Sequence, residues 1–203
     1  MKHYDREYFE RWYRRSDVGV GQREFVTRKV LLAVAAAEFV LGRRIASVLD
    51  VGCGEGLWRA PLRRLRPGVA YAGFDSSEYA IARFGRTRNL KRAGLADMAS
   101  QRLAKAYDLV VCADVMHYVS EPEVRAGLKV IAKKTRGAAF VEAFTNADAI
   151  DGDHDHFQDR SPARYRRLFA EAGLVPLGLH LYVTKGAMHT LTALEQGAAG
   201  AVR

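Results

Sequence analysis

Acidic side chains recur in this sequence at or beside the ends of its apolar segments. They are Asp50, Asp75, Asp97, Asp114 and Glu142. Charged groups are costly to bury without a partner, so core packing does not explain acids at so many successive segment ends. Carboxylates accept hydrogen bonds from hydroxyl groups and attract cations, so this row is suited to a positively charged ligand that carries a ribose.

Three alternating glycines follow the first of these acids. Gly52, Gly54 and Gly56 lie between an apolar run and a segment with helical spacing, and Cys53 lies inside the turn. Glycine lets backbone N–H groups approach a ligand without a Cβ in the way, beside the partly positive start of a helix. In the dinucleotide pattern G-x-G-x-x-G the third glycine would fall at Leu57, so that pattern is not met. The turn therefore indicates a different nucleotide-like ligand.

The segments that position these residues alternate between two patterns. Apolar runs indicate strands, and apolar residues at helical spacing follow most of them, which predicts a parallel sheet with right-handed crossovers. The pair Lys185-Gly186 predicts a hairpin between 175–184 and 187–194. We expect a doubly wound, Rossmann-like α/β fold with a seven-stranded sheet, mostly parallel with a C-terminal antiparallel hairpin, and with helices on both faces. The other expected strands are 45–51, 69–74, 90–95, 107–113 and 137–141.

Length and composition favour one domain. A chain of 203 residues with 49% hydrophobic content is long enough to bury a sizeable core. We expect a single domain over 1–203, with an N-terminal helical lid (1–22), a Rossmann-like core (23–196) and a frayed tail (197–203). No apolar run is long enough to span a membrane. The two cysteines suggest neither a disulfide framework nor a zinc site, so the cytoplasm is the expected location.

The formal net charge of +9 raises the question of a nucleic-acid partner. The cations are spread along the chain, mostly on what should be the solvent faces of helices. This distribution suits plain solvated faces, a surface that contacts RNA, or a pocket for an anionic substrate. The sequence leaves the three interpretations open.

Aromatic residues near the N-terminus fall at helical spacing. They are Tyr4, Tyr8, Phe9, Trp12 and Tyr13. Such a stripe is typical of a helix face that packs on the core. It also suits a lid over a ligand cleft, because the helix precedes the first strand and carries more aromatic surface than docking needs. Residues 14–22 are expected to form a mobile link.

Between 45 and 194 the chain resembles the class I S-adenosylmethionine (SAM)-dependent methyltransferases. The run from Asp50 to Gly56 resembles the first motif of that family, and the run 112–119 resembles its fourth motif. The resemblance implies that Asp75 binds both ribose hydroxyls and that Asp97 accepts a hydrogen bond from the adenine amino group. The alternatives are a helix-capping role for Asp75 and an ordinary loop position for Asp97. The cofactor-binding residues that it implies are Asp50, Gly52, Cys53, Gly54, Gly56, Asp75, Ser76, Asp97, Met98, Ala113 and Asp114.

Three histidines are candidate catalytic residues on the acceptor side. His117, just past the fourth strand, is the first candidate for a base or for positioning the acceptor, with core packing as the alternative. His154 and His156 lie in the polar loop 151–159, where the family carries acceptor-side insertions. The candidates for contact with the substrate or within the lid are Tyr4, Tyr8, Trp12 and Glu142.

The same loop has aspartates at alternate positions, as a calcium-binding loop does. However, the sixth position is His156 where such a loop needs glycine, and the twelfth is Pro162 where it needs glutamate. We therefore expect no metal site.

The resemblance implies methyl transfer from SAM, with S-adenosylhomocysteine (SAH) as product, by in-line displacement. The expected acceptor is an oxygen, nitrogen or carboxylate of a small metabolite, and the arginine content favours an anionic one. An RNA methyltransferase that uses a basic surface is the second hypothesis, and a non-catalytic cofactor-binding module is the third. We expect a monomer or a homodimer with no membrane partner.

Overall fold

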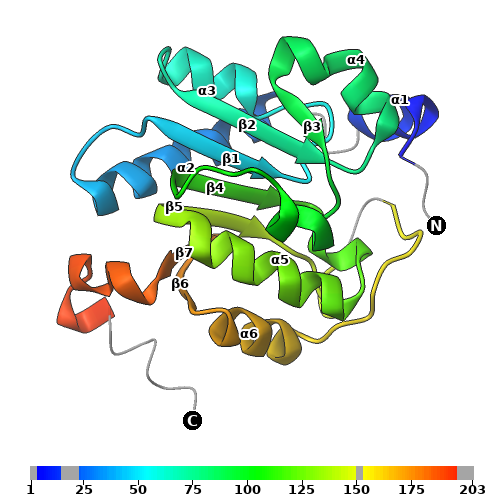
Figure 1. Ribbon diagram of the computed structural model, residues 1–203. Coiled ribbons are helices and arrows are strands. Elements are labelled where there is room, and N and C mark those ends of the chain that lie inside the picture. The colour runs from blue at the N-terminus through cyan, green and yellow to red at the C-terminus, as the bar shows by residue number, and fades with distance from the viewer. Residues whose placement is uncertain (1–3, 15–22, 150–152, 196–203) are drawn as a thin grey trace.

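The computed structural model describes residues 4–14, 23–149 and 153–195, which form one seven-stranded sheet with helices on both faces (Figure 1). The strands are β1 (Ser47–Val51), β2 (Ala70–Asp75), β3 (Leu90–Arg92), β4 (Tyr107–Ala113), β5 (Thr135–Glu142), β6 (Leu174–Gly178) and β7 (Leu181–Thr184). Their order is β3-β2-β1-β4-β5-β7-β6. β7 pairs antiparallel with β5 and β6, and the other pairs are parallel. This confirms the predicted fold class.

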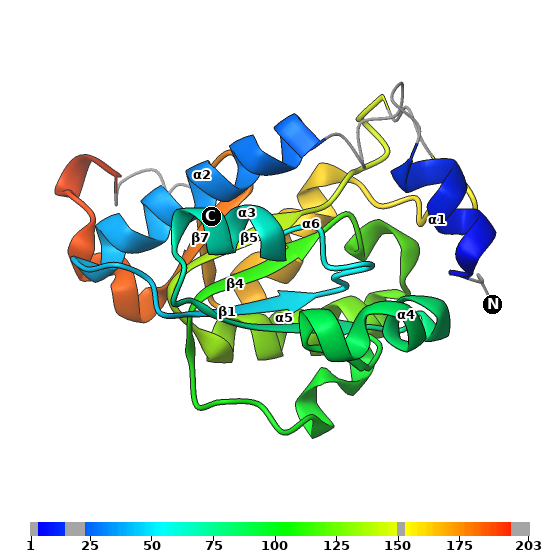
Figure 2. The ribbon, with the colours of Figure 1, turned by 90° about the horizontal axis from the view of Figure 1, so that it is seen from above.

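The helices cover the sheet in two groups. They are α1 (Arg6–Tyr13), α2 (Arg23–Leu41), α3 (Arg59–Leu65), α4 (Glu78–Arg88), α5 (Glu121–Lys134) and α6 (Pro162–Glu171). One apolar cluster joins α2, α3 and α4 to the sheet, and a second joins α5 and α6 to the opposite face. Successive side chains of a strand point to opposite faces, so Val48 enters the first cluster and Leu49 the second. Figure 2 shows α2 and α5 on opposite sides of the sheet.

Polar side chains cap the helices that begin near the ends of strands. At the start of α4, the Ser77 hydroxyl accepts a hydrogen bond from the Ala80 N–H at 3.1 Å. At the start of α5, the Glu123 carboxylate accepts one from the Ser120 N–H at 2.8 Å. Caps of this kind satisfy N–H groups that have no partner inside the helix. They therefore fix where the chain turns from strand to helix.

The change of strand order falls between β1 and β4. β1 pairs with β2 on one side and with β4 on the other, and crossovers leave this point in opposite directions. Ligands of such sheets bind beyond the carboxyl ends of the strands at this point. In both ribbon views α1 lies at that end of the sheet (Figures 1 and 2).

The C-terminal hairpin is present, but the predicted position of its turn is wrong. The turn lies at Leu179 and His180, between β6 and β7, and both residues have positive φ angles of 51° and 64°. The predicted turn residues instead open a 3₁₀ helix, η4 (Lys185–Thr190), which buries Ala187 against Val183. Glycine at the second turn position is a common hairpin signal, whereas leucine seldom adopts the left-handed conformation, so the sequence pointed to the wrong pair.

The remaining predictions about the fold are nearly correct or concern residues that the structure does not describe. β3 covers only Leu90–Arg92 of the expected 90–95. The expected link lies outside the described residues apart from Arg14, as does the expected frayed tail, and their conformation stays a prediction. Within the described ranges, no helix has the length and apolar character needed to cross a membrane.

Candidate active site

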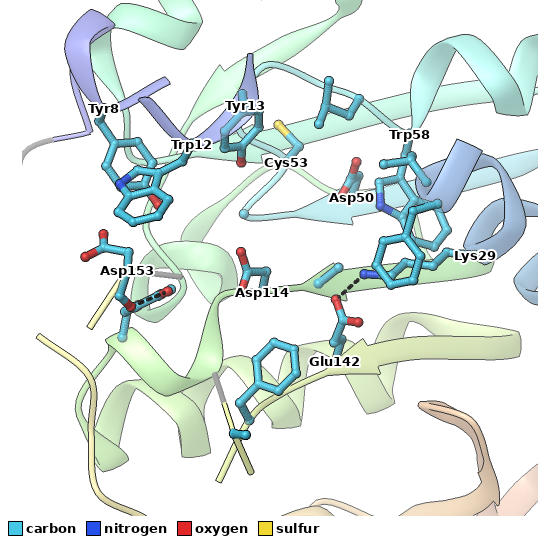
Figure 3. Close-up of a pocket in the computed structure, with 18 residues that line it drawn as sticks. Tyr8, Trp12, Tyr13, Lys29, Asp50, Cys53, Trp58, Asp114, Glu142 and Asp153 are labelled. Carbon is cyan, nitrogen blue, oxygen red and sulfur yellow. Dashed lines mark hydrogen bonds and ion pairs between the residues drawn. The ribbon is translucent and has the colours of Figure 1, made fainter. Parts of the chain in front are cut away.

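Two cavities with common walls lie at the carboxyl ends of the parallel strands. The larger has a volume of about 1260 Å³ and the smaller about 190 Å³. The residues that line both are Tyr8, Tyr13, Gly52, Asp114 and Tyr118. The larger cavity extends over the β2 and β3 side of the sheet, and the smaller extends over the β4 and β5 side. Figure 3 shows the smaller cavity.

The glycine turn forms the wall between the cavities. Gly52 and Gly54 have φ angles of 71° and 51°, a conformation that side chains disfavour. A Cβ on Gly52 would collide with Val115, and one on Gly54 would lie 2.6 Å from the Tyr13 hydroxyl. The turn therefore needs glycine both for its backbone angles and for its close approach to the chain after β4 and to α1. Gly56 lies farther along, where a Cβ would come within 3.2 Å of Leu90.

Asp75 stands at the end of β2, in the wall of the larger cavity. Its carboxylate accepts hydrogen bonds from the Gly54 N–H at 2.7 Å and the Ser77 N–H at 2.8 Å. Burial raises the pKa of Asp75, and these N–H donors oppose the shift. The Ser76 N–H also stabilises the charged carboxylate. A carboxylate has about four lone-pair sites, so part of its capacity to accept hydrogen bonds stays available for a ligand. Ser76 lines the same cavity.

Asp50 lies on β1, in the wall of the smaller cavity, with only 2% of its surface exposed. The Tyr71 hydroxyl donates a hydrogen bond to its carboxylate at 2.6 Å. Burial raises the pKa of Asp50 to about 7 against the lowering effect of that hydrogen bond, and the charge of Asp75 adds to the rise. Asp50 therefore changes its charge near neutral pH. Cys53 lines this cavity as well and is largely buried.

The far end of the larger cavity holds Asp97 in an exposed 3₁₀ turn, η2 (Ala96–Ser100). Its Oδ2 accepts a hydrogen bond from the Gly94 N–H at 3.3 Å. The side chain of Met98 points the other way and is buried in the core. Of these two predicted cofactor residues, Asp97 alone presents its side chain to the cavity.

Asp114 and His117 form a pair at the junction of the cavities. Asp114 has a φ of 62° and lines both cavities, and Ala113 beside it lines the smaller. His117 is 0% exposed, and its Nε2 lies 3.1 Å from Asp114 Oδ1, at an angle too bent for a hydrogen bond. Its Nδ1 accepts a hydrogen bond from the Phe144 N–H at 3.4 Å, which leaves Nε2 facing Asp114. His117 therefore lines neither cavity, and it lies directly behind Asp114, which lines both.

The other predicted histidines lie apart. His156 lines the larger cavity, and His154 is exposed and lies among the lining residues of neither cavity. Asp153 lines the smaller cavity, where its carbonyl accepts a hydrogen bond from the Tyr118 hydroxyl at 3.0 Å. In the polar loop 151–159, for which we expected no metal site, Asp151 lies outside the described residues. Among the residues that are described, no group of three side chains is placed to hold a metal ion.

An ion pair that the sequence did not predict closes the far side of the smaller cavity. Lys29 of α2 donates to Glu142 at the end of β5, with 2.7 Å between Nζ and Oε2 (Figure 3). The two side chains are only 18% and 4% exposed. Lys29 lies on the same helix face as the buried Val26 and Val30. The position of a lysine on an otherwise apolar helix face was the sequence signal that could have predicted a buried ion pair.

Helix α1 covers both cavities. Tyr4 faces the larger cavity, Trp12 the smaller, and Tyr8 both. Phe9 is buried and packs edge-on against Tyr13 with 4.7 Å between ring centroids. Burial raises the pKa of the Tyr8 and Tyr13 hydroxyls, so these phenols stay protonated at neutral pH. The aromatic stripe thus packs on the core with one part and covers the cleft with another.

Two contacts tie α1 to the core. The Ser77 hydroxyl donates to the Tyr4 carbonyl, and Arg14 forms an ion pair with Glu55 at 2.9 Å. Glu55 follows the glycine turn directly. The position of the helix is therefore linked to the wall that separates the cavities.

Comparison with known proteins places this fold in a family. Residues 22–179 match the family model described as a methyltransferase domain, and the chain therefore belongs to that family. No curated protein matches the sequence. The family and the fold together confirm the predicted class, a class I SAM-dependent methyltransferase.

Solved structures share the fold at low sequence identity. The magnesium protoporphyrin IX methyltransferase of Synechocystis, with bound SAH, has a TM-score of 0.60 at 20% identity, over 84% of this chain and 86% of that chain. A SAM-dependent methyltransferase of Archaeoglobus fulgidus has a TM-score of 0.61 at 17% identity, over 83% and 73%. DesVI of Streptomyces venezuelae has a TM-score of 0.60 at 15% identity, over 80% and 93%.

Proposed function

We propose that this methyltransferase transfers the methyl group of SAM to an oxygen, nitrogen or carboxylate of a small metabolite. The observation that carries the proposal is the wall of the cleft, where a glycine turn separates the carboxylates of Asp75 and Asp97 from a smaller cavity beside Asp114. A nucleoside fits the first side, and a small acceptor fits the second. The domain family and the SAH-bound neighbour support the same activity.

In this proposal the larger cavity receives the adenosine part of SAM. Asp75 binds the ribose hydroxyls with the lone pairs that the N–H groups of Gly54 and Ser77 leave available. Asp97 lies at the far end for the adenine amino group. The glycine turn and the chain at Ala113 and Asp114 receive the methionine part.

When bound, SAM supplies a methyl group on a sulfonium sulfur. The bond from that carbon to the acceptor forms as its bond to sulfur breaks, and the electron pair of the broken bond goes to sulfur. The chain contributes mainly orientation, which supplies on the order of 7 kcal/mol or more in well-aligned reactions. Asp114, at the junction of the cavities, is placed to accept a proton from the acceptor, and the His117 ring packs behind it with Nε2 3.1 Å from the Asp114 carboxylate.

In this proposal α1 acts as a roof that limits the access of water to the site and moves aside to admit ligands. The volume of the smaller cavity, about 190 Å³, lies below the ~300–1,000 Å³ of most ligand pockets. Opening breaks the contacts of Tyr4 with Ser77 and of Arg14 with Glu55. We expect residues 4–14 to gain protection from hydrogen exchange when SAH binds, and unchanged exchange there would reject the lid.

Calorimetric titration with SAH tests the proposal. Wild-type protein should bind one SAH per chain, and Asp75→Ala should weaken binding by about 100-fold, since two hydrogen bonds to a charged acceptor are lost. Asp75→Asn keeps one acceptor oxygen and should lose less. Asp159→Asn removes an exposed carboxylate outside both cavities and serves as the control. Equal affinity of Asp75→Ala and wild type would refute the placement of the ribose.

A further inference from the structure

The positive charge of the chain is concentrated in one stretch. Residues 56–96, which run from the glycine turn through α3, β2, α4 and β3, contain nine lysines and arginines and two acids. The remaining residues contain 23 lysines and arginines and 21 acids, so their charges nearly cancel. Most of the net charge of +9 therefore belongs to the side of the molecule that this stretch forms.

Most cations of this stretch have no acid beside them. Arg66 forms an ion pair with Glu38, and Arg92 forms one with Glu78. In the part of the chain that the structure describes, no carboxylate lies within ion-pair distance of the other seven cations, which we call the basic surface. They are Arg59, Arg63, Arg64, Arg83, Arg86, Arg88 and Lys91. None of the seven lines either cavity, so the basic surface lies outside the cleft.

The helices on the opposite face of the sheet balance their charges differently. Arg125 of α5 and Arg164 of α6 both pair with Glu121, and Arg125 also pairs with Glu171. These ion pairs join α5 to α6, whereas the cations of the basic surface join no carboxylate among the described residues. The charges of the basic surface are therefore available to a partner outside the chain.

The elements that carry the basic surface pack together. Leu65 of α3, Phe84 of α4 and Leu90 of β3 belong to one apolar cluster on the same face of the sheet. The end of α4 also meets the start of α3, because the Arg88 guanidinium donates a hydrogen bond to the Glu55 carbonyl. Figure 1 shows α3 and α4 on the same side of the molecule, along β2. The exposed arginines of the two helices therefore lie on one side of the sheet, and they are Arg63, Arg64, Arg83 and Arg86.

One aromatic ring supports two of these arginines. The guanidinium carbon of Arg88 lies 3.8 Å from the centre of the Phe84 ring, and that of Arg83 lies 5.4 Å from it. Contact with a ring face holds a guanidinium group in place without neutralising its charge. Arg83 and Arg88 are therefore held on the surface with their full charge.

The composition of the basic surface favours phosphate groups as its ligands. Six of its seven cations are arginines, and the guanidinium group presents N–H donors in a planar fork that matches phosphate oxygens. Binding to a membrane or to another protein usually adds apolar contacts. Among the described residues, the large apolar side chains that are exposed lie outside 56–96. A nucleic acid fits this surface better, because its backbone is bound mainly through charge.

We infer that the basic surface binds the phosphate backbone of a nucleic acid. Phosphate contacts carry no sequence information, so this binding is independent of base sequence. The surface is separate from the cleft, so the nucleic acid is a second partner and not the methyl acceptor. The inference therefore goes beyond the proposed function and does not depend on it.

Fluorescence anisotropy with a labelled single-stranded RNA of about 20 nucleotides tests the inference. Wild-type protein should bind this RNA with a Kd of about 1–100 μM near physiological salt. The logarithm of the binding constant should fall against the logarithm of the salt concentration with a slope of about −3 to −5, as for about four to seven phosphate contacts. No binding, or a slope near zero, would overturn the inference.

Vesicles of phosphatidylcholine and phosphatidylserine are titrated in parallel at equal phosphate concentration. Both ligands present phosphate groups, but the vesicle also offers an apolar interior, for which the basic surface has no exposed large side chain. The protein should therefore bind the RNA more tightly than the vesicles. Tighter binding to the vesicles would assign the surface to a membrane and overturn the inference.

Two charge reversals locate the binding on the basic surface. Arg63→Glu/Arg64→Glu changes α3, and Arg83→Glu/Arg86→Glu changes α4. Each should weaken RNA binding by about tenfold or more at low salt, because two attractive contacts become repulsive. The four side chains are exposed, so thermal unfolding should stay close to that of wild type. If one variant fails to fold, the other decides, and unchanged RNA affinity in a folded variant would overturn the inference.

Arg166→Glu/Arg167→Glu is the matched control. These two arginines are adjacent and exposed, as Arg63 and Arg64 are, but they lie on α6 at the opposite face of the sheet. The control changes the net charge by the same amount and should weaken RNA binding by less than about threefold, because salt screens distant charges. An equal loss in the control would show that the net charge of the chain, and not the basic surface, attracts the RNA.

Discussion

The two cavities differ in how the chain assembles them. The floor of the larger cavity consists of residues at or just after strand ends, such as Asp75 at the end of β2 and the glycine turn after β1. The smaller cavity is completed by side chains that meet only when the helices dock, and Lys29 and Glu142 are 113 positions apart. The first arrangement follows from sheet topology, because parallel strands end at one edge. The second depends on the packing of α2 and α1 against that edge.

This difference separates the part of the site that the shared fold determines from the part that is particular to this chain. On the proposed function, the donor site is built from strand ends and is reproduced wherever the sheet is reproduced. The proposed acceptor site is built from helix faces and changes when a few exposed positions change. Variants that damage both cavities, or one alone, therefore test the comparison.

Gly52→Ala should have the largest effect, because the turn is a wall of both cavities. The new Cβ collides with Val115, and the φ of 71° is unfavourable for alanine. We expect a loss of about 2–4 kcal/mol in the free energy of unfolding and loss of measurable SAH binding. Gly68→Ala, where a Cβ meets nothing within 4 Å, is the control for thermal unfolding and calorimetry. Full SAH affinity in Gly52→Ala would show that the turn does not approach the cofactor.

Asp50→Asn should remove a pH dependence of stability. The pKa of Asp50 is raised from 3.8 to about 7 in the folded protein, so the folded state keeps a proton that the unfolded chain releases above about pH 4. The stability from this proton is full below pH 4, is lost as pH rises, and is gone above about pH 7.

Urea unfolding at several pH values measures this effect. Relative to Asp50→Asn, the wild-type protein should lose about 2–3 kcal/mol of stability between pH 5 and pH 7.5. Parallel curves for the two proteins would mean that Asp50 is ionised throughout this range.

His117→Phe should affect methyl transfer more than cofactor binding. The phenyl ring fills the buried space but places no ring nitrogen beside Asp114. With an acceptor that is methylated, we expect kcat to fall by about 10- to 100-fold through misplacement of Asp114, with the Kd of SAH and the unfolding temperature little changed. His189→Ala, at an exposed position in η4, is the control. A change in SAH affinity with kcat preserved would contradict a positioning role.

Glu55→Gln should give the smallest effect, because Arg14 is 43% exposed and such ion pairs contribute less than about 1 kcal/mol. We expect SAH to dissociate about 2- to 5-fold faster in stopped-flow measurements, as α1 loosens. Glu10→Gln breaks the ion pair with Arg6 inside α1 and leaves the core untouched. If both variants release SAH at the same rate, the contact with Glu55 does not hold the roof.

Much of the fold could be predicted because local signals and topology agree. β4 has the predicted bounds, and the capping box at Ser120 marks the start of α5 as expected. The acids at strand ends could be placed at one edge because right-handed crossovers leave few alternatives. Asp75, Asp97 and Asp114 all line the cleft as a result.

The remaining features depend on tertiary contacts that the sequence does not encode locally. The turn at Leu179 and His180 uses backbone angles that neither residue favours. His117 is fully buried and Asp114 has a positive φ angle of 62°, and no sequence pattern predicted either feature. Lys29 reaches Glu142 only because α2 crosses the end of β5.

One helix stands over both cavities, with Tyr8 and Tyr13 above their common wall. A displacement of α1 that admits one ligand therefore uncovers the other. On the proposed function, SAH and the methylated product both leave when α1 moves. The acceptor therefore cannot be exchanged while the cofactor cavity stays covered.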